Sequence, residues 1–260
     1  MEVVVAKPTS KQPSAGSFPT LNYFDVLNLD RDADRYADVR CVLTELRSEL
    51  TDCSDYRSSL IQFYESFIFP EFLSTLKKKN VAIKTAMGLD YLGMVYEYSN
   101  ILALEIPRAG TLPTDLLIDR IQRLPGPARN INIAKGVIDI KRKEEGAILS
   151  HIVNYSNLPE IGEPVRIAIC DQMLATGNTI SKAISILQEK YGRRIESLFL
   201  GSVVGVQQGI ETIRDTTSRY GIKTRLVLGA IDDGLNEKSY IVPGLGDAGD
   251  RVSGVWRPNS

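Results

Sequence analysis

The chain has 260 residues, of which 43% are hydrophobic and 24% are charged, and its formal net charge at pH 7 is -1. This composition excludes a disordered chain, and the length allows one elaborated globular domain or two small ones. Because 31 Lys and Arg residues balance 32 Asp and Glu residues, no global charge favours a nucleic acid or an anionic membrane, and we expect neither as a partner.

The chain has few residues that could form disulfides or zinc sites. Its cysteines, Cys41, Cys53 and Cys170, are odd in number and lack metal-ligand spacing, and His151 is the only histidine. We therefore expect neither a disulfide framework nor a Cys/His zinc site. The apolar run at residues 3–6 is too short for a signal-peptide core or a membrane span, so we expect a cytoplasmic protein.

The first part of the chain differs in composition from the rest. Residues 7–20, "KPTSKQPSAGSFPT", are rich in Pro, Ser, Gly and Thr and show no apolar periodicity. This pattern predicts a mobile N-terminal extension over residues 1–35, followed by a single domain over residues 36–260.

Two helices are predicted next. From Asp34, apolar residues recur at steps of three and four, as on one face of a helix: Tyr36, Val39, Leu43, Leu46 and Leu50. A second helical stretch begins near Asp55, and Pro70 should kink or end it.

Short apolar runs then alternate with helical segments. Buried strands are predicted at residues 100–106, 166–170, 197–204 and 224–231, and helices closed by a glycine at residues 178–192 and 206–221. This alternation is typical of parallel βαβ units. Residues 136–159 do not fit it, and they predict a polar loop or β arm that projects from the sheet and closes over a site.

The segment "AICDQMLATGNTISKAI", residues 168–184, passes from a strand through a loop of small and hydroxylated residues into a helix. Ligands of open parallel sheets bind at the carboxyl ends of the strands. The backbone N–H groups from Ala175 to Thr179 and the helix N-terminus favour a phosphate, while Asp171 suits a sugar diol. An ordinary strand-to-helix turn with Thr or Asn as the N-cap explains the same residues, and the local pattern does not decide between the two.

Two familiar nucleotide motifs are excluded. The loop lacks Gly-Lys-Ser/Thr, so it is not a P-loop. The string "GLGDAG" at residues 244–249 matches G-x-G-x-x-G, but only eleven residues follow it. That is too short for the βαβ unit of a dinucleotide site.

Several segments resemble a known family. "CDQMLATGNTIS" resembles the phosphoribosyl-pyrophosphate loop of type I phosphoribosyltransferases, and "AIDDGLNEKSYIVPGLGDAGDR" (230–251) resembles the base-binding segment of uracil phosphoribosyltransferases. "EIPRAG" (105–110) is similar to that family's pyrophosphate-contacting turn, residues 136–159 to its flexible arm, and "LTELRSELTDCSDYR" (43–57) to its N-terminal pattern. The resemblance covers roughly Val39 to Gly254.

The resemblance implies an α/β fold of the type I phosphoribosyltransferase kind, with a central, mostly parallel sheet flanked by helices, a β arm and a small hood of N- and C-terminal segments. It also implies an enzyme that makes UMP and pyrophosphate from uracil and 5-phosphoribosyl 1-pyrophosphate (PRPP), and a homodimer or higher homo-oligomer. Another pyrimidine-like acceptor, or a regulatory paralogue that binds the same ligands, remains open at this point.

The same resemblance implies the site residues. Asp171, Arg108 and Asp247 would be catalytic. The PRPP-binding residues would be Arg108, Arg142, Asp171, Gln172, Met173, Leu174, Ala175, Thr176, Gly177, Asn178, Thr179 and Asp247. The uracil-binding residues would be Tyr240, Ile241, Gly246, Asp247 and Ala248. A magnesium ion is implied, held mainly by the pyrophosphate and water, with no protein ligand.

The chain departs from the family pattern at three places near the site. Gln172 replaces a proline, Pro107 replaces an aliphatic residue, and Ser239 replaces a glycine. The arm has also lost its acidic, Thr-rich tip. These departures bear on the acceptor and on regulation more than on the donor chemistry, since none removes a charged group that the chemistry needs.

Overall fold

The computed structural model describes residues 24–29, 36–124, 130–145 and 148–255. The strands are β1 (Phe24–Asn28), β2 (Lys78–Lys84), β3 (Asp90–Tyr96), β4 (Ser99–Glu105), β5 (Ile131–Glu145), β6 (Ile148–Asn157), β7 (Val165–Leu174), β8 (Ile195–Val206), β9 (Lys223–Asp232), β10 (Gly234–Leu235) and β11 (Ile241–Val242). The helices are α1 (Ala37–Arg47), α2 (Cys53–Phe63), the π-helix η2 (Tyr64–Ile68), α3 (Phe69–Ser74), α4 (Thr111–Gln122), α5 (Asn178–Tyr191), the 3-10 helix η4 (Gly192–Arg194), α6 (Gln207–Tyr220) and α7 (Ala248–Ser253).

A seven-stranded sheet in the order β1-β9-β8-β7-β4-β5-β6 forms the centre of the fold. Its strands are parallel except for the β5–β6 pair. The strands expected from the four apolar runs are β4, β7, β8 and β9, and the expected helices are α5 and α6, each followed by a glycine with positive φ. The expected α/β fold with a mostly parallel sheet is therefore confirmed.

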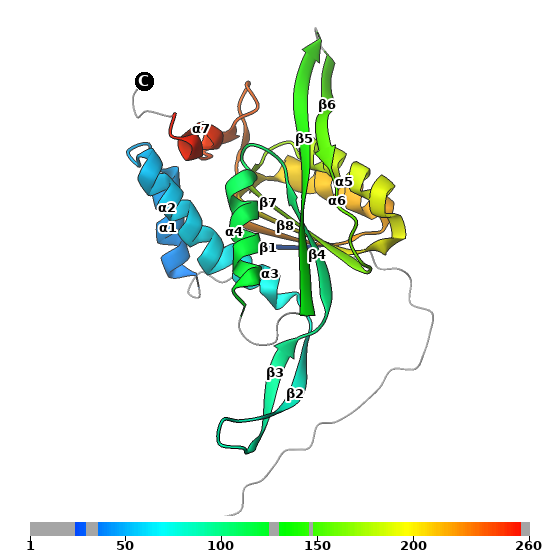
Figure 1. Ribbon diagram of the computed structural model, residues 1–260. Coiled ribbons are helices and arrows are strands. Elements are labelled where there is room, and N and C mark those ends of the chain that lie inside the picture. Colours follow the sequence, from blue (N-terminus) through cyan, green and yellow to red (C-terminus); the bar gives the residue numbers. More distant parts are fainter. Residues whose placement is uncertain (1–23, 30–35, 125–129, 146–147, 256–260) are drawn as a thin grey trace, which may run out of the picture.

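Helices cover both faces of the sheet, which explains why its central strands are apolar without alternation. All seven residues of β4 are buried. Ile101 and Ala103 of this strand belong to the hydrophobic cluster that includes α1 to α4, whereas Leu102 and Leu104 belong to the one that includes α5 and α6. Because successive side chains of a strand point to opposite faces, the two clusters lie on opposite sides of the sheet, and the helices that contribute to them cover opposite faces (Figure 1).

The N-terminal helices differ in detail from the expectation. Helix α1 ends at Arg47, and Leu50 lies exposed beyond it. The second helical stretch does not end at Pro70, because α3 continues to Ser74. The departure from regular geometry comes one turn earlier, in η2. Pro70 stands in the first turn of α3, where a missing N–H is tolerated.

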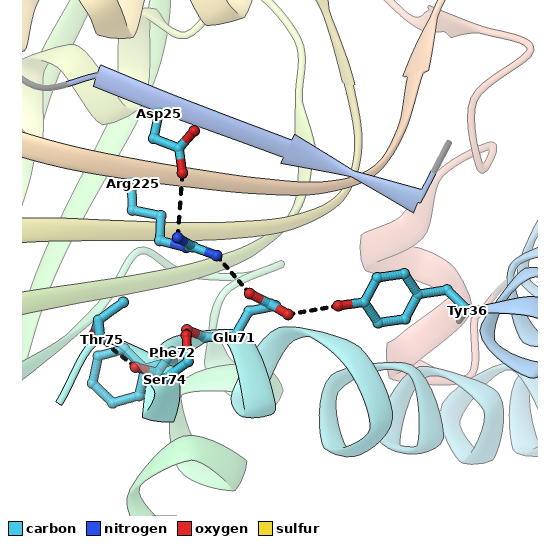
Figure 2. Close-up of polar contacts among 7 residues, drawn as sticks. All are labelled: Asp25, Tyr36, Glu71, Phe72, Ser74, Thr75 and Arg225. Carbon is cyan, nitrogen blue, oxygen red and sulfur yellow. Dashed lines mark hydrogen bonds and ion pairs between the residues drawn. The ribbon is translucent and has the colours of Figure 1, made fainter. Parts of the chain in front are cut away.

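Part of the expected N-terminal extension belongs to the sheet. Strand β1 pairs in parallel with β9, with Phe24 opposite Thr224. Figure 2 shows that Arg225 of β9 donates to Asp25 of β1 over 3.2 Å and to Glu71 of α3 over 2.6 Å. Glu71 also accepts the hydroxyl of Tyr36, which precedes α1, over 2.6 Å. The prediction of a mobile segment over 1–35 is therefore wrong for β1, while residues 1–23 and 30–35 lie outside the described residues.

Two β ribbons project from the body of the protein (Figure 1). The arm predicted at 136–159 is formed by β5 and β6, which pair from Val137 and Asn157 outwards. The hairpin of β2 and β3 was not predicted. Its exposed large apolar side chains are Ile83, Met87, Leu89, Tyr91, Leu92 and Met94. Within the described residues, no helix is both long and apolar enough to cross a membrane.

Candidate active site

A cavity of about 690 Å³ lies at the carboxyl ends of β4 and β7. It is bounded by the turn after β4, the arm strand β5, the loop from β7 to α5, and the segment between β10 and α7. Of the residues expected at the site, those that line it are Arg108, Asp171, Met173, Leu174, Ala175, Thr176, Gly177, Asn178, Thr179, Tyr240, Ile241 and Asp247. Segments far apart in the sequence thus meet at one place.

Some expected site residues do not line the cavity. Gln172 and Ala248 are fully buried elsewhere, and Gly246 is exposed beside the cavity wall. Arg142 belongs to the arm strand β5, but its side chain lies outside the described part of the chain. The expectation that Gln172, Gly246 and Ala248 contact ligand directly therefore finds no support in the cavity wall.

Sequence reasoning missed several residues of the wall, among them Asp139, Lys141 and Lys238. Ile140, which lies between the two arm residues, also lines the cavity, and the pairing of β5 with β6 shifts register between Asp139 and Ile140. Because a bulge interrupts the regular alternation of side chains, no signal in the sequence shows which arm residues face the site. Lys238 lies two positions before Tyr240, and no pattern in the sequence distinguishes it, whereas Ser239, which also lines the cavity, is one of the departures from the family pattern.

The loop after β7 leaves the N-terminus of α5 without a side-chain cap. The N-cap residue is Gly177, with φ of 77°, and no side chain accepts a cap hydrogen bond from the helix. The hydroxyl of Thr176 approaches the N–H of Asn178 only at 3.5 Å. The alternative of a Thr or Asn N-cap is therefore not observed, and the first N–H groups of α5 can bind an anion.

Position 177 needs a glycine both because its φ is positive and because a side chain would not fit there. A Cβ at this position would lie 3.0 Å from the carbonyl oxygen of Gly209 and 3.0 Å from the Cβ of Thr212, both on α6. The loop is thus held tightly between α6 and the cavity.

Asp171 lies within β7 rather than after it, because the strand continues four residues beyond the predicted end at Cys170. Its Oδ1 accepts the N–H of Gln172 over 2.7 Å. Although Asp171 is partly accessible through the cavity, desolvation by the surrounding protein raises its pKa to about 7, against the opposing effect of N–H groups from Gln172 and Met173. Its carboxyl therefore titrates near neutral pH, where a diol could bind the ionised form.

The turn after β4 carries Arg108 into the cavity. The N–H of Gly110 closes the turn on the carbonyl of Ile106 over 3.1 Å. A Cβ at Gly110 would lie 2.7 Å from that carbonyl oxygen and 3.1 Å from the carbonyl oxygen of Cys170, so the turn packs directly against β7. On its outer side, Glu105 accepts hydrogen bonds from Thr111 over 2.7 Å and pairs with Lys135 over 2.7 Å. The turn is therefore braced against the sheet.

The segment after β9 is fixed by a buried carboxylate. Asp232 pairs with Arg47 of α1 over 2.6 Å and accepts the N–H of Gly244 over 2.8 Å. Arg47 also donates to the carbonyl of Gly244 over 3.0 Å. In the following loop, Ser239 has φ of 62°, a left-handed conformation that glycine adopts more easily. The Cβ that Ser239 adds thus stands at a strained position in the cavity wall.

The hood closes on this segment through α7. Asp247 caps α7 by accepting the N–H of Asp250 over 3.0 Å. The buried guanidinium of Arg251 donates to the carbonyls of Leu46, Leu245, Ser48 and Thr51, and it stacks on the ring of Tyr56 at 4.1 Å. The C-terminal segment is therefore tied to α1 and α2 (Figure 1).

Among the described residues, carboxylate oxygens, which hard cations prefer as ligands, line the cavity without forming a metal-binding cluster. Asp139, Asp171 and Asp247 bring carboxylates to its wall. Among the residues that the structure describes, however, no group of three or more His, Cys, Asp or Glu side chains could hold a metal ion.

Comparisons with known proteins show the family and the fold. A family model described as "Uracil phosphoribosyltransferase" matches residues 36–254. The "Uracil phosphoribosyltransferase" of Sulfurisphaera tokodaii is 32% identical over 219 residues, which cover 82% of this chain and 94% of the relative. The protein of the same name from Dictyoglomus thermophilum is 33% identical over 213 residues, which cover 82% and 93%. The solved "AQ2163 protein from Aquifex aeolicus" shares the fold, with a TM-score of 0.68 at 23% identity over 88% of this chain and 98% of that one.

Proposed function

This chain belongs to the uracil phosphoribosyltransferase family, and we propose that the cavity described above is its active site. The protein is a pentosyltransferase of pyrimidine salvage that makes UMP and pyrophosphate from uracil and PRPP. The relatives compared above carry the uracil name, which favours uracil over another pyrimidine as the acceptor. One observation supports the location of the site above all: the turn of Arg108, the loop at the start of α5 and the segment around Tyr240 line the same cavity.

PRPP, the donor, would bind across the turn of Arg108 and the loop at the start of α5. The uncapped N–H groups at the start of α5 would hold the 5′-phosphate, as helix N-termini do for anions. Asp171 would accept hydrogen bonds from the ribose hydroxyls, and the planar fork of Arg108 would bind the pyrophosphate. Arg142, carried on the arm, would be a second pyrophosphate contact.

The acceptor would lie against the segment of Tyr240, Ile241 and Asp247. Backbone groups around Gly246 and Ala248 would shape this slot from behind rather than line it. In the reaction, a bond forms between N1 of uracil and C1 of the ribose while the bond from C1 to the pyrophosphate oxygen breaks, and the proton leaves N1. Positive charge builds on the sugar and negative charge on the pyrophosphate, so Asp171 and Arg108 would stabilise the two centres that gain charge.

We propose that magnesium enters with the donor. When bound, the ion would neutralise charge on the leaving pyrophosphate. The carboxylates of Asp139 and Asp171 could accept hydrogen bonds from its water ligands, since Mg²⁺ usually keeps several waters and takes few protein ligands.

We further propose that the protein works as a homo-oligomer, at least a dimer, in the cytoplasm. The hairpin of β2 and β3 supports this, because its large exposed apolar side chains form a surface that monomers rarely leave uncovered. We also propose that residues 36–260 form one domain, to which β1 adds an edge strand.

The test of the function is pyrophosphate release from PRPP and magnesium, with and without uracil. We expect uracil-dependent release by the wild-type enzyme and a loss of about 100-fold or more in Asp171→Asn and Arg108→Ala, since each removes a group placed at developing charge. Asp215→Asn, an exposed site on α6, is the control that should keep full activity. PRPP binding without uracil-dependent release would overturn the assignment of uracil as acceptor.

A further inference from the structure

Gln172 is a fully buried polar residue directly beside the proposed donor site, yet it does not line the cavity. It follows Asp171 in β7, and its side chain points to the N-terminal helices. There its Oε1 accepts the hydroxyl of Tyr56 over 2.8 Å. Its Nε2 donates to the carbonyl of Ala109 over 3.1 Å. The amide thus connects α2 to the turn that carries Arg108.

Both partners of Gln172 are themselves held in place. Tyr56 is buried on α2, and Arg251 of α7 stacks on its ring at 4.1 Å. Burial raises the pKa of Tyr56 well above its usual range, so its hydroxyl remains protonated and donates to Gln172. Ala109 lies between Arg108 and Gly110 in the turn that the N–H of Gly110 closes on the carbonyl of Ile106. The carbonyl of Ala109 faces β7, where it accepts the hydrogen bond from Gln172.

We infer that Gln172 is a positioning residue, which holds the pyrophosphate turn through Ala109 and is itself fixed by Tyr56. This inference rests on the proposed function, because it assigns a cause to the placement of Arg108 for PRPP. A proline, the residue that the family resemblance led us to expect here, has no side-chain amide. The link between α2 and the turn is therefore a feature of this chain's own sequence.

The physical reason is the cost of leaving buried polar groups unpaired. Without the amide, the carbonyl of Ala109 and the hydroxyl of Tyr56 lose their partners in a dry environment, and the turn gains freedom to move toward water. Binding of pyrophosphate would then have to order Arg108, which costs conformational entropy. Affinity for the donor should fall while the uracil slot keeps its shape, because the hydrogen bonds of Arg251 and Asp232 that hold it do not involve the Gln172 amide, and the Tyr56 ring on which Arg251 stacks is unchanged.

The variants that test this are Gln172→Met and Tyr56→Phe. Methionine keeps the volume and the backbone N–H that donates to Asp171, which proline would remove. Phenylalanine keeps the ring on which Arg251 stacks and removes only the hydroxyl. The matched control is Tyr191→Phe, which removes a buried hydroxyl that donates to the carbonyl of Pro159 over 2.7 Å, remote from the cavity.

Binding of PRPP with magnesium would be measured by calorimetry, and the KM for uracil and kcat by pyrophosphate release. We expect the dissociation constant for PRPP to rise about 10-fold in Gln172→Met and about 3-fold in Tyr56→Phe, with the KM for uracil changed less than about 2-fold. The double variant should match Gln172→Met alone, because both changes break one link. In a variant that already carries Arg108→Ala, adding Gln172→Met should not raise the dissociation constant for PRPP further.

Three results would overturn the inference. PRPP affinity could stay at the wild-type value in Gln172→Met while the melting temperature falls as in Tyr191→Phe, which would make the role purely structural. Gln172→Met could still lower PRPP affinity when Arg108→Ala is already present, which would mean that Gln172 does not act through this turn. Failure of the wild-type protein to bind PRPP would instead overturn the proposed function, and the inference with it.

Discussion

Replacing Asp171 by Asn should change how the stability of the protein depends on pH. In the folded protein, desolvation raises the pKa of Asp171 to about 7, whereas an unfolded Asp has a pKa of about 3.9. Between these values the folded state binds a proton that the unfolded state does not, so the free energy of unfolding falls as pH rises from about 4 to about 7. The Asn side chain of Asp171→Asn does not titrate, so the free energy of unfolding of this variant should lack that contribution to the pH dependence.

The size of the effect follows from the shift. A difference of about 3 pKa units corresponds to about 4 kcal/mol at most, and water in the cavity should reduce it to about 2 kcal/mol. Relative to the wild type, Asp171→Asn should therefore gain about 2 kcal/mol of stability between pH 4 and pH 8. The ionised form that destabilises the protein is the one proposed to bind the ribose diol, so affinity for PRPP should rise over the same pH range.

Urea denaturation at several pH values between 4 and 8, without ligands, measures this slope. The exposed variant Asp215→Asn serves as the control and should follow the wild type throughout. Parallel curves for the wild type and Asp171→Asn would refute the reasoning, since they would mean that the carboxyl of Asp171 is solvated much as in the unfolded chain.

Three further variants test other parts of the structure. Arg251→Met should lower the free energy of unfolding by about 3 to 5 kcal/mol, because it removes hydrogen bonds to three buried carbonyls and to the half-buried carbonyl of Ser48, and a loss below about 1 kcal/mol in chemical denaturation would contradict the role of this guanidinium. Ser239→Gly should stabilise the protein by about 0.5 to 1 kcal/mol, since it relieves a left-handed φ of 62°, and a lower melting temperature would speak against strain there. Leu92→Glu, on the exposed hairpin, should shift sedimentation toward a monomer, whereas an unchanged oligomer would place the interface elsewhere.

The central sheet could be predicted from sequence because both of its faces are covered. Strands β4, β7, β8 and β9 each contain a short apolar run, and α5 and α6 end at glycines. Strand β1 could not be predicted in this way, since its five residues, FDVLN, are neither a continuous apolar run nor strictly alternating, and their partner is β9, about 200 residues later. The β2–β3 hairpin was missed because most of its side chains are exposed on both faces.

The site was predictable only to the level of segments. The loop, the turn and the base-binding segment were identified by resemblance, and they do meet at one cavity. What the sequence did not reveal is the direction in which each side chain points. Strand β7 continues through Asp171 to Leu174, so neighbouring residues face opposite ways, and Gln172 points into the protein while Asp171 lines the cavity.

The contacts that hold the hood and the edge of the sheet join segments that are far apart in the sequence. Arg251 reaches the carbonyl of Leu46 across 205 positions, and Arg225 reaches Asp25 across 200. At about 5 to 20 residues per second, a ribosome takes about 10 to 40 seconds to produce the later partner after the earlier one has emerged. During that interval the surface of α2 that packs against α7 in the folded protein lacks this partner. The donor half of the protein can be assembled before Arg251 is synthesised, but the uracil slot can close only afterwards.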